Sequence, residues 1–185
     1  MSIKKMFFAV VSMVMMVTSS CFAHQVTLKD LNIGGIYVGQ PMREVASIYK
    51  NPAGTMEIPP KGFGYIFTFD GDIGMNIQPN GSDINDSTIK KITVDGLQNS
   101  DLIMSSGIGL GSTLDDVLST YGEPDVFSND VGYFFIVKAF KTGDYRRVLL
   151  KHIEYSISSR DYLGFYFLNN RVCAIEMEKD TIRAK

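Results

Sequence analysis

The clearest hydrophobic pattern in the chain has helical spacing. Between residues 112 and 124, apolar side chains recur at i, i+3, i+4 and i+7, at Leu114, Val117, Leu118 and Tyr121. Ser112 and Asp115 suit the N-cap and N3 positions of a helix. Gly122 suits the left-handed position after a helix, and Pro124 prevents continuation. The pattern predicts a helix over residues 113 to 121.

Most of the remaining apolar residues alternate with polar ones or are β-branched and aromatic, which indicates strands. The expected strands are residues 62–69, 73–78, 88–94, 131–140, 146–157, 162–168 and 171–178. Their short connections favour antiparallel neighbours, and Asn169-Asn170 tolerates the positive φ angles of a two-residue hairpin turn. Residues 79–87 are expected to be a mobile polar loop and residues 98–106 a linker.

The helical pattern occurs twice. Residues 35–52 align with residues 107–124 at a constant offset of 72, without a gap and with seven identical positions. The first copy has Pro41 at the start of its helix and an apolar stripe of Met42, Val45, Ala46 and Tyr49. Gly39 and Gly111 precede the two helices as turn glycines. The chain is therefore predicted to be an α+β protein of two tandem repeats, each a short helical segment on a three- or four-stranded antiparallel sheet.

This motif resembles two exported groups of proteins. A short helix introduced by Gly-x-Ser/Thr, closed by Tyr-Gly-x-Pro and followed by an antiparallel sheet is similar to the tandem modules of the β-lactamase inhibitory protein. It is also similar to the single module of outer-membrane assembly lipoproteins of the SmpA/OmlA type. The resemblance implies a tandem helix-plus-sheet fold and a binding role. It carries no binding residue, lactamase inhibition or membrane assembly across to this chain.

The N-terminus has the pattern of a targeting segment. Lys4 and Lys5 precede an apolar run over residues 6 to 17, and Cys21-Phe22-Ala23 forms a cleavage site with small residues. We expect a signal peptide over residues 1–23, cleaved after Ala23, and a periplasmic or secreted protein without a stable membrane span. The two repeats then cover residues 24–100 and 101–185. An alternative is an envelope-assembly lipoprotein anchored at Cys21.

Charge and cysteine content narrow the function classes. Loss of the two lysines of the signal segment changes the net charge from −2 to −4. No basic patch remains to hold phosphates, so nucleic acid is not expected as a partner. Cleavage leaves Cys173 as the sole cysteine, which excludes an internal disulfide; its strand position favours a buried thiol over a reactive one.

The candidate binding residues are tyrosines. In residues 162–168, Leu163, Phe165 and Phe167 alternate with Tyr162 and Tyr166, so one face is apolar and the other carries phenols. We expect Tyr133 and Tyr155 to join Tyr162 and Tyr166, provided that the strand registers allow it. Such tyrosines serve either as a recognition surface for a protein or cell-envelope component or as packing between the two repeats.

The sequence offers little for catalysis or metal binding. His24 lies at the predicted mature terminus and His152 within a strand, and neither belongs to a catalytic or metal motif. We therefore predict an exported, non-catalytic binding module with no catalytic residue, metal or cofactor. The alternative in another class is a small periplasmic hydrolase using His152 with a nearby acid such as Glu154.

Overall fold

The computed structural model describes residues 24–58, 62–81, 83, 86–136, 138, 142–143 and 146–179. The predicted signal peptide, its cleavage site at Ala23 and the alternative anchor at Cys21 lie outside these residues. Among the residues described, no helix is both long enough and apolar enough to cross a bilayer.

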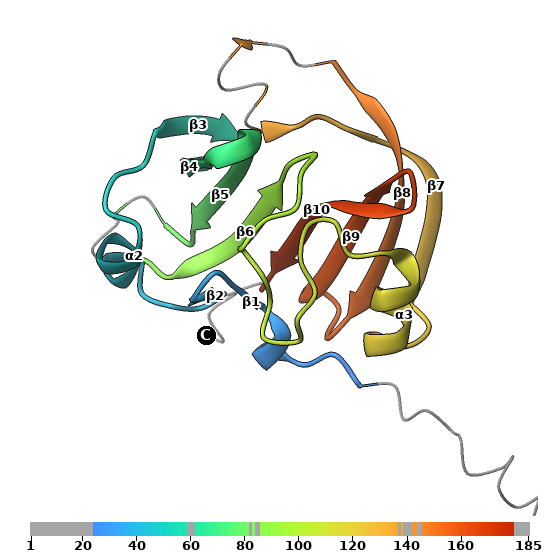
Figure 1. Ribbon diagram of the computed structural model, residues 1–185. Helices are drawn as coiled ribbons and strands as arrows, with labels where there is room; N and C mark the ends of the chain where they lie inside the picture. The colour runs from blue at the N-terminus through green and yellow to red at the C-terminus, as the bar shows by residue number, and fades with distance from the viewer. Residues whose placement is uncertain are drawn as a thin grey trace, which may run out of the picture.

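The strands of the described chain form one eight-stranded antiparallel sheet and one two-stranded sheet (Figure 1). The large sheet has the order β3-β4-β5-β6-β10-β9-β8-β7. Its strands are β3 (Gly54–Ile58), β4 (Gly62–Phe69), β5 (Ile73–Pro79), β6 (Ile89–Asp95), β7 (Val126–Tyr133), β8 (Val148–Ser156), β9 (Tyr162–Leu168) and β10 (Arg171–Glu178). The small sheet pairs β1 (Asn32–Ile33) with β2 (Ile36–Tyr37).

The fold is therefore α+β, as predicted, but the two halves do not have separate sheets. In each half a helix precedes four consecutive strands: α2 (Met42–Ile48) precedes β3 to β6, and α3 (Leu114–Tyr121) precedes β7 to β10. The last strands of the two halves, β6 and β10, pair with each other from Asp95↔Ala174 to Lys91↔Glu178. This pairing removes an exposed edge from each half and merges the strands into one sheet.

The helix α3 lies where its apolar stripe places it, although its cap is one residue later than predicted. Thr113 and Asp116, rather than Ser112 and Asp115, form the reciprocal capping box: Asp116 N–H donates to Thr113 Oγ1 at 3.1 Å, and Thr113 N–H donates to Asp116 Oδ2 at 2.7 Å. Gly122 is the C-cap of the helix and has the positive φ expected of it, 79°, but its ψ of −155° lies outside the left-handed helical region.

The first helix is shorter and starts one residue later than predicted, because Pro41 is its N-cap rather than its first residue. A tyrosine stands at the end of each helix: Tyr49 directly follows α2, and Tyr121 is the last residue of α3. The hydroxyl of each tyrosine donates a hydrogen bond back to the turn that precedes β2 or Ile108, respectively. Tyr49 Oη donates to Gly34 O at 2.5 Å, and Tyr121 Oη donates to Ser106 Oγ at 2.6 Å. The donors, like the acceptors, are separated by the same 72 residues as the repeated motif.

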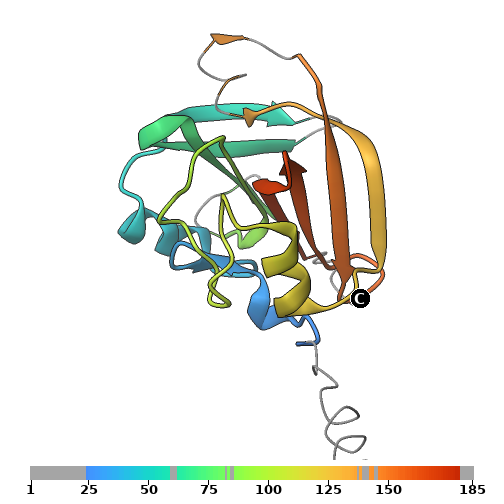
Figure 2. The ribbon, with the colours of Figure 1, turned by 45° about the vertical axis from the view of Figure 1, so that its right-hand side comes forward.

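The main core lies between one face of the sheet and the helices, turns and small sheet that cover it (Figure 2). Its wholly buried members include Leu31, Met75, Ile92, Ile153 and Phe165. Residues 98–106 contribute to this core through Leu102 and Met104, so the expected linker is packed rather than a spacer. The opposite face of the sheet carries the polar residues described below.

The strands 62–69, 162–168 and 171–178 have the predicted bounds, and Asn169 and Asn170 have φ angles of 51° and 63°. The predicted strand over residues 131–140 is wrong. Strand β7 begins at Val126, bulges between Ser128 and Val131, where Asp130 has a φ of 60°, and ends at Tyr133. The sequence pattern also missed β3 and the small sheet. Part of the predicted loop 79–87 lies outside the described residues, and its Ser87 is buried.

Candidate functional site

The face of the sheet opposite the main core has rows of polar residues that cross the strands. Asn76, Thr93 and Glu176 are successive Cα partners on β5, β6 and β10. Gln78, Lys91 and Glu178 form the next row. The alternation along each strand explains these rows, because Asn76 and Gln78 flank Ile77, which points into the main core.

The end of β7 and the residues that follow it lie over this polar face. We call residues 133–136 the arm. The arm is held by Asp95, a wholly buried residue of β6, whose Oδ2 accepts hydrogen bonds from the hydroxyl of Tyr133 at 3.2 Å and from the backbone N–H of Ile136. Burial, with Asp95 as the next cause, raises the pKa of Tyr133 well above its usual value. Asp95 therefore determines where the arm crosses the sheet.

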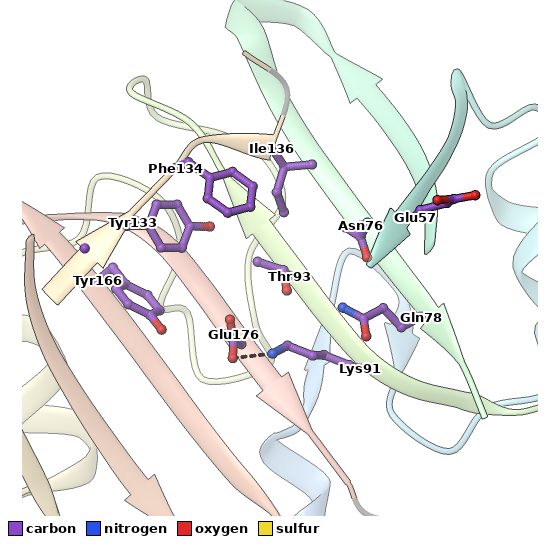
Figure 3. A pocket seen from close by; sticks show the side chains of 11 residues that line it. Glu57, Asn76, Gln78, Lys91, Thr93, Tyr133, Phe134, Ile136, Tyr166 and Glu176 are labelled. Atoms are coloured by element: carbon purple, nitrogen blue, oxygen red, sulfur yellow. Dashed lines mark hydrogen bonds and ion pairs between the residues drawn. The ribbon is translucent and has the colours of Figure 1, made fainter. Parts of the chain in front are cut away.

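A pocket of about 250 Å³ lies between the arm and the polar face (Figure 3). One side of the pocket is aromatic and apolar, and the other is made of the polar rows. The lining residues are Glu57, Asn76, Gln78, Lys91, Thr93, Gly132, Tyr133, Phe134, Ile136, Tyr166 and Glu176. This combination of an apolar wall and a few convergent polar groups is typical of ligand-binding pockets.

The largely buried charged groups of the pocket are paired, whereas Glu57 on β3 is exposed and forms no ion pair within the described residues. Lys91 forms ion pairs with Glu176 and, at 3.5 Å, with Glu178. The hydroxyl of Tyr162 donates to Glu176 Oε1, and Lys91 Nζ donates to the Tyr162 oxygen at 3.1 Å. The side chains of Lys91 and Glu176 are 18% and 15% exposed, so the pair is largely removed from water. Because Lys91 is paired, the pocket lining offers no unpaired cation to an anionic ligand.

Asn76 differs from its neighbours because its carboxamide is buried without a hydrogen-bond partner in the described structure. The residue is 1% exposed, and neither Oδ1 nor Nδ2 is bonded. The amide lies against Gly64 of β4: a Cβ at Gly64 would stand 2.5 Å from both of its polar atoms. A buried amide without partners is unusual in folded proteins and costs stability.

Three of the four predicted tyrosines lie on the pocket side of the sheet. Tyr133 and Tyr166 line the pocket, with ring centroids 4.7 Å apart, and Tyr162 is bonded to Glu176 beside it. All three are half-buried, and burial is the largest cause of the raised pKa of Tyr162 and Tyr166. The expected face of tyrosines is thus partly a pocket wall.

Tyr155 does not join them. It is a Cα partner of Leu163, so the register places it on the core face of the sheet, where it is 4% exposed. Its ring packs against Tyr121 and Phe165, and its hydroxyl donates to Gly122 O at 2.8 Å beyond the end of α3. Tyr155 is therefore a core residue, and the prediction that it joins the other three tyrosines on one face is wrong.

His152 lies on the same face as Tyr166, its Cα partner, and their ring centroids are 4.4 Å apart. It is 8% exposed, and its Nε2 has no hydrogen-bond partner in the described structure. Burial lowers the pKa of His152. Nε2 lies over Gly164, where a Cβ would stand 3.0 Å away, so the ring is enclosed by packing rather than directed into the pocket.

Cys173 is buried, and its Sγ donates to Tyr166 O at 3.4 Å. Burial raises the pKa of this thiol to about 12, which favours the inert interpretation. The residue lies at the bulge between Val172 and Ala174 in the β9–β10 pairing.

Sequence reasoning missed Asn76, Lys91, Asp95 and Glu176 as site residues. Their alternation with apolar neighbours marked a second face of the sheet, but the covering arm was assigned to a strand. The fold and the pocket define an α+β protein whose large antiparallel sheet has a helix-covered core on one face and a small pocket on the other.

In comparisons with known proteins, this chain matches solved structures by its fold but matches no protein family by its sequence. A search against protein families finds no match to the sequence, and no curated protein matches it. Among solved structures, a cysteine-rich secretory protein from Staphylococcus aureus has a TM-score of 0.50 and 13% identity over 83% of this chain and 47% of that chain. An extracellular SCP-domain protein from Bacillus anthracis has a TM-score of 0.47 and 9% identity, covering 84% of this chain and 46% of its own.

This chain spans about half the length of these solved structures. The S. aureus protein is described as a cysteine-rich secretory protein, so the expected resemblance to the β-lactamase inhibitory protein and the SmpA/OmlA lipoproteins is wrong. The motif that suggested the resemblance consists of turn glycines, helix-stripe residues and a stop proline. Many unrelated helix-plus-sheet proteins need these residues for folding, so the motif does not distinguish families.

Proposed function

We propose that this protein is an exported, non-catalytic binding module that holds a protein or cell-envelope component in the pocket beneath the arm. The pocket between the polar rows and the arm carries the proposal. It combines aromatic side chains, which bury area at low entropic cost, with convergent polar groups that give orientation. Phe134, 39% exposed, is positioned for a partner to contact.

Export to the periplasm or the cell exterior, with cleavage after Ala23, is supported by the N-terminal pattern of charge and hydrophobicity. The similar fold of an S. aureus protein that is described as secretory agrees with it. Mass spectrometry of the mature N-terminus tests this part: a chain starting at His24 is expected, whereas a lipid-modified Cys21 would establish the anchored alternative.

We also propose that the two halves are tandem repeats. Two observations support duplication beyond the sequence motif: the shared order of a helix and four strands, and the equivalent tyrosine hydrogen bonds of Tyr49 and Tyr121. The binding pocket breaks this symmetry, since its covering arm belongs to the second half alone.

The proposal of a non-catalytic role rests on the surroundings of His152. A general base must lie within hydrogen-bond reach of the proton that it removes. The ring of His152 packs against the ring of Tyr166 and is closed in by Gly164. Within the described residues, its Nε2 has no hydrogen-bond partner, Glu154 included. The pKa of His152 is lowered chiefly by desolvation, as expected for a histidine packed in the protein interior.

The test compares two phenylalanines that carry exposed rings. Phe134 lines the pocket, whereas Phe127 on β7 is 53% exposed and lies outside it. The exported protein, isolated from the cells that make it, is immobilised and exposed to envelope extract. We expect F134D to reduce the captured partner at least tenfold and F127D to leave it unchanged. Equal capture by both variants, or no capture by the folded wild type above a blank surface, would overturn the proposal.

A further inference from the structure

The unpartnered carboxamide of Asn76 specifies what the pocket can hold. Asn76 is almost completely buried, and yet both of its polar atoms lack hydrogen bonds within the described structure. An amide that only filled space would be better replaced by an apolar side chain of the same shape, because a buried donor and acceptor without partners cost stability. Asn76 lines the pocket, which provides a reason to retain the amide. Both polar atoms are covered where the amide lies against Gly64, so a ligand bonds to them only when the side chain turns from Gly64 toward the pocket.

The two polar atoms of a carboxamide lie side by side, and one donates while the other accepts. A ligand that satisfies both at once needs an acceptor next to a donor along one edge. A primary carboxamide has this arrangement, since its C=O and one N–H are on the same side of the C–N bond. A trans peptide group has its N–H and C=O on opposite sides, so it can satisfy only one of the two. A carboxylate lacks the donor, and an ammonium group lacks the acceptor.

The size of the pocket agrees with a small group, and its charge does not favour an anion. Its volume of about 250 Å³ is below the roughly 300–1,000 Å³ of pockets for drug-sized ligands. Lys91 is already paired with Glu176 and Glu178, so no unpaired cation is offered to a carboxylate there. The rings of Tyr133 and Tyr166 can pack against the methylene groups of a short side chain.

We propose that the pocket binds the primary carboxamide of a glutamine or asparagine side chain of a partner polypeptide, paired with both polar atoms of Asn76. This inference rests on the proposed binding function and assigns its recognition chemistry. The ligand's amide nitrogen donates to Asn76 Oδ1, and its oxygen accepts from Asn76 Nδ2.

The first experiment uses small probes and backbone amide NMR of the exported protein. Acetamide is compared with N-methylacetamide, which is a trans secondary amide, and with acetate. We expect acetamide at millimolar concentration to give saturable shifts at Gly64, Asn76 and Thr93, and the other two probes to bind at least tenfold more weakly. Equal binding of N-methylacetamide or acetate would overturn the pairing.

The second experiment tests the source of the carboxamide. N-acetylglutamine N-methylamide is compared with its glutamate counterpart; both contain the same two secondary amides. We expect at least tenfold tighter binding of the glutamine compound. Equal binding of the two compounds would overturn a role for the side chain.

A matched pair of variants separates recognition from folding. N76L removes the amide and keeps a similar volume, and S87A removes another buried polar atom that has no partner and lies outside the pocket. We expect N76L to lose acetamide binding at least tenfold while the midpoint of urea unfolding stays the same or rises. S87A is expected to bind as the wild type does. Unchanged probe binding by N76L, or a lowered unfolding midpoint that reveals a structural role for the amide, would overturn the inference.

The two proposals fail in different ways. If no probe binds but F134D still abolishes capture of the envelope partner, the binding function stands and the carboxamide assignment fails. If wild-type protein captures no partner and no probe binds, both fail.

Discussion

The carboxamide of Asn76 lies flat against the backbone of Gly64 on the neighbouring strand. A Cβ at residue 64 would approach its Oδ1 and Nδ2 to 2.5 Å, closer than real Cβ contacts. The side chain of Asn76 thus occupies space that any other residue at position 64 would fill. Both residues are buried.

We predict that G64A destabilises the protein by about 1–3 kcal/mol, the usual cost of overpacking a buried site. The free energy of unfolding in urea measures the effect. G81A is the control, since its nearest neighbour is the Ser87 Cβ at an ordinary 3.8 Å, and we expect a change within about 0.5 kcal/mol. If G64A left the free energy of unfolding unchanged, the Asn76 amide would have an alternative position.

We predict that K91M costs about 2 kcal/mol of stability, below the roughly 3–5 kcal/mol of fully buried pairs because Lys91 is partly exposed. The variant leaves both Glu176 and Glu178 without their shared cation. E176Q is expected to cost less, because Lys91 keeps Glu178. Urea unfolding of the double variant K91M/E176Q provides the check. Its loss should be smaller than the sum of the single losses, and strict additivity would mean that the two side chains do not interact.

Because of His152, the free energy of unfolding should decrease as the pH is lowered. Burial lowers the pKa of His152 in the folded state below the 6.5 of an exposed histidine. The unfolded chain therefore binds more protons below about pH 6.5, and the contribution of the neutral ring is lost as the pH falls toward the folded pKa. H152Q should flatten this part of the profile of unfolding free energy against pH.

Two neighbouring carboxyl groups also affect that profile. Glu176 partly offsets the effect of burial on His152, and burial raises the pKa of Glu154, which gives a slope of the opposite sign near its own titration. The difference between wild type and H152Q isolates the histidine. An unchanged slope between pH 7 and pH 5 in H152Q would contradict the assignment of a buried neutral ring.

The hydroxyls of Tyr49 and Tyr121 should contribute similarly to stability if their positions are equivalent. We predict that Y49F and Y121F each cost about 1 kcal/mol, the typical contribution of one hydrogen bond. Thermal or urea unfolding measures both, with Y37F as a control at a half-exposed ring. A loss at only one of the two positions would argue against equivalent halves.

Cys173 should react with a thiol reagent only when the protein unfolds. The thiol is buried, and its pKa is raised to about 12, chiefly by burial, so the folded protein contains almost no accessible thiolate at pH 8. The rate of labelling by a chromogenic disulfide, measured on the chain lacking the signal segment, is expected to rise with urea in parallel with unfolding. Rapid labelling of the native protein would show that the site is open.

Several elements could be predicted because their causes are local. The stripe from Leu114 to Tyr121 needs one buried face at helical spacing, and the turn at Asn169 and Asn170 needs two residues that tolerate positive φ. The alternation in residues 162–168 likewise placed Phe165 on the core face and Tyr166 on the other. In each case, the relevant neighbours lie within a few residues along the chain.

The sequence by itself determined the α+β class, the two helix positions, the bounds of the strands 62–69, 162–168 and 171–178, and the existence of a polar second face. Only the tertiary structure decided that β6 pairs with β10, that Tyr155 belongs to the core and that Asp95 holds the arm over Asn76. Those outcomes depend on register and on contacts between residues far apart in sequence. The pairing of Asp95 with Tyr133, which spans 38 positions, is such a contact. Local periodicity carries no information about which distant partner will satisfy a buried polar group, or leave it open for a ligand.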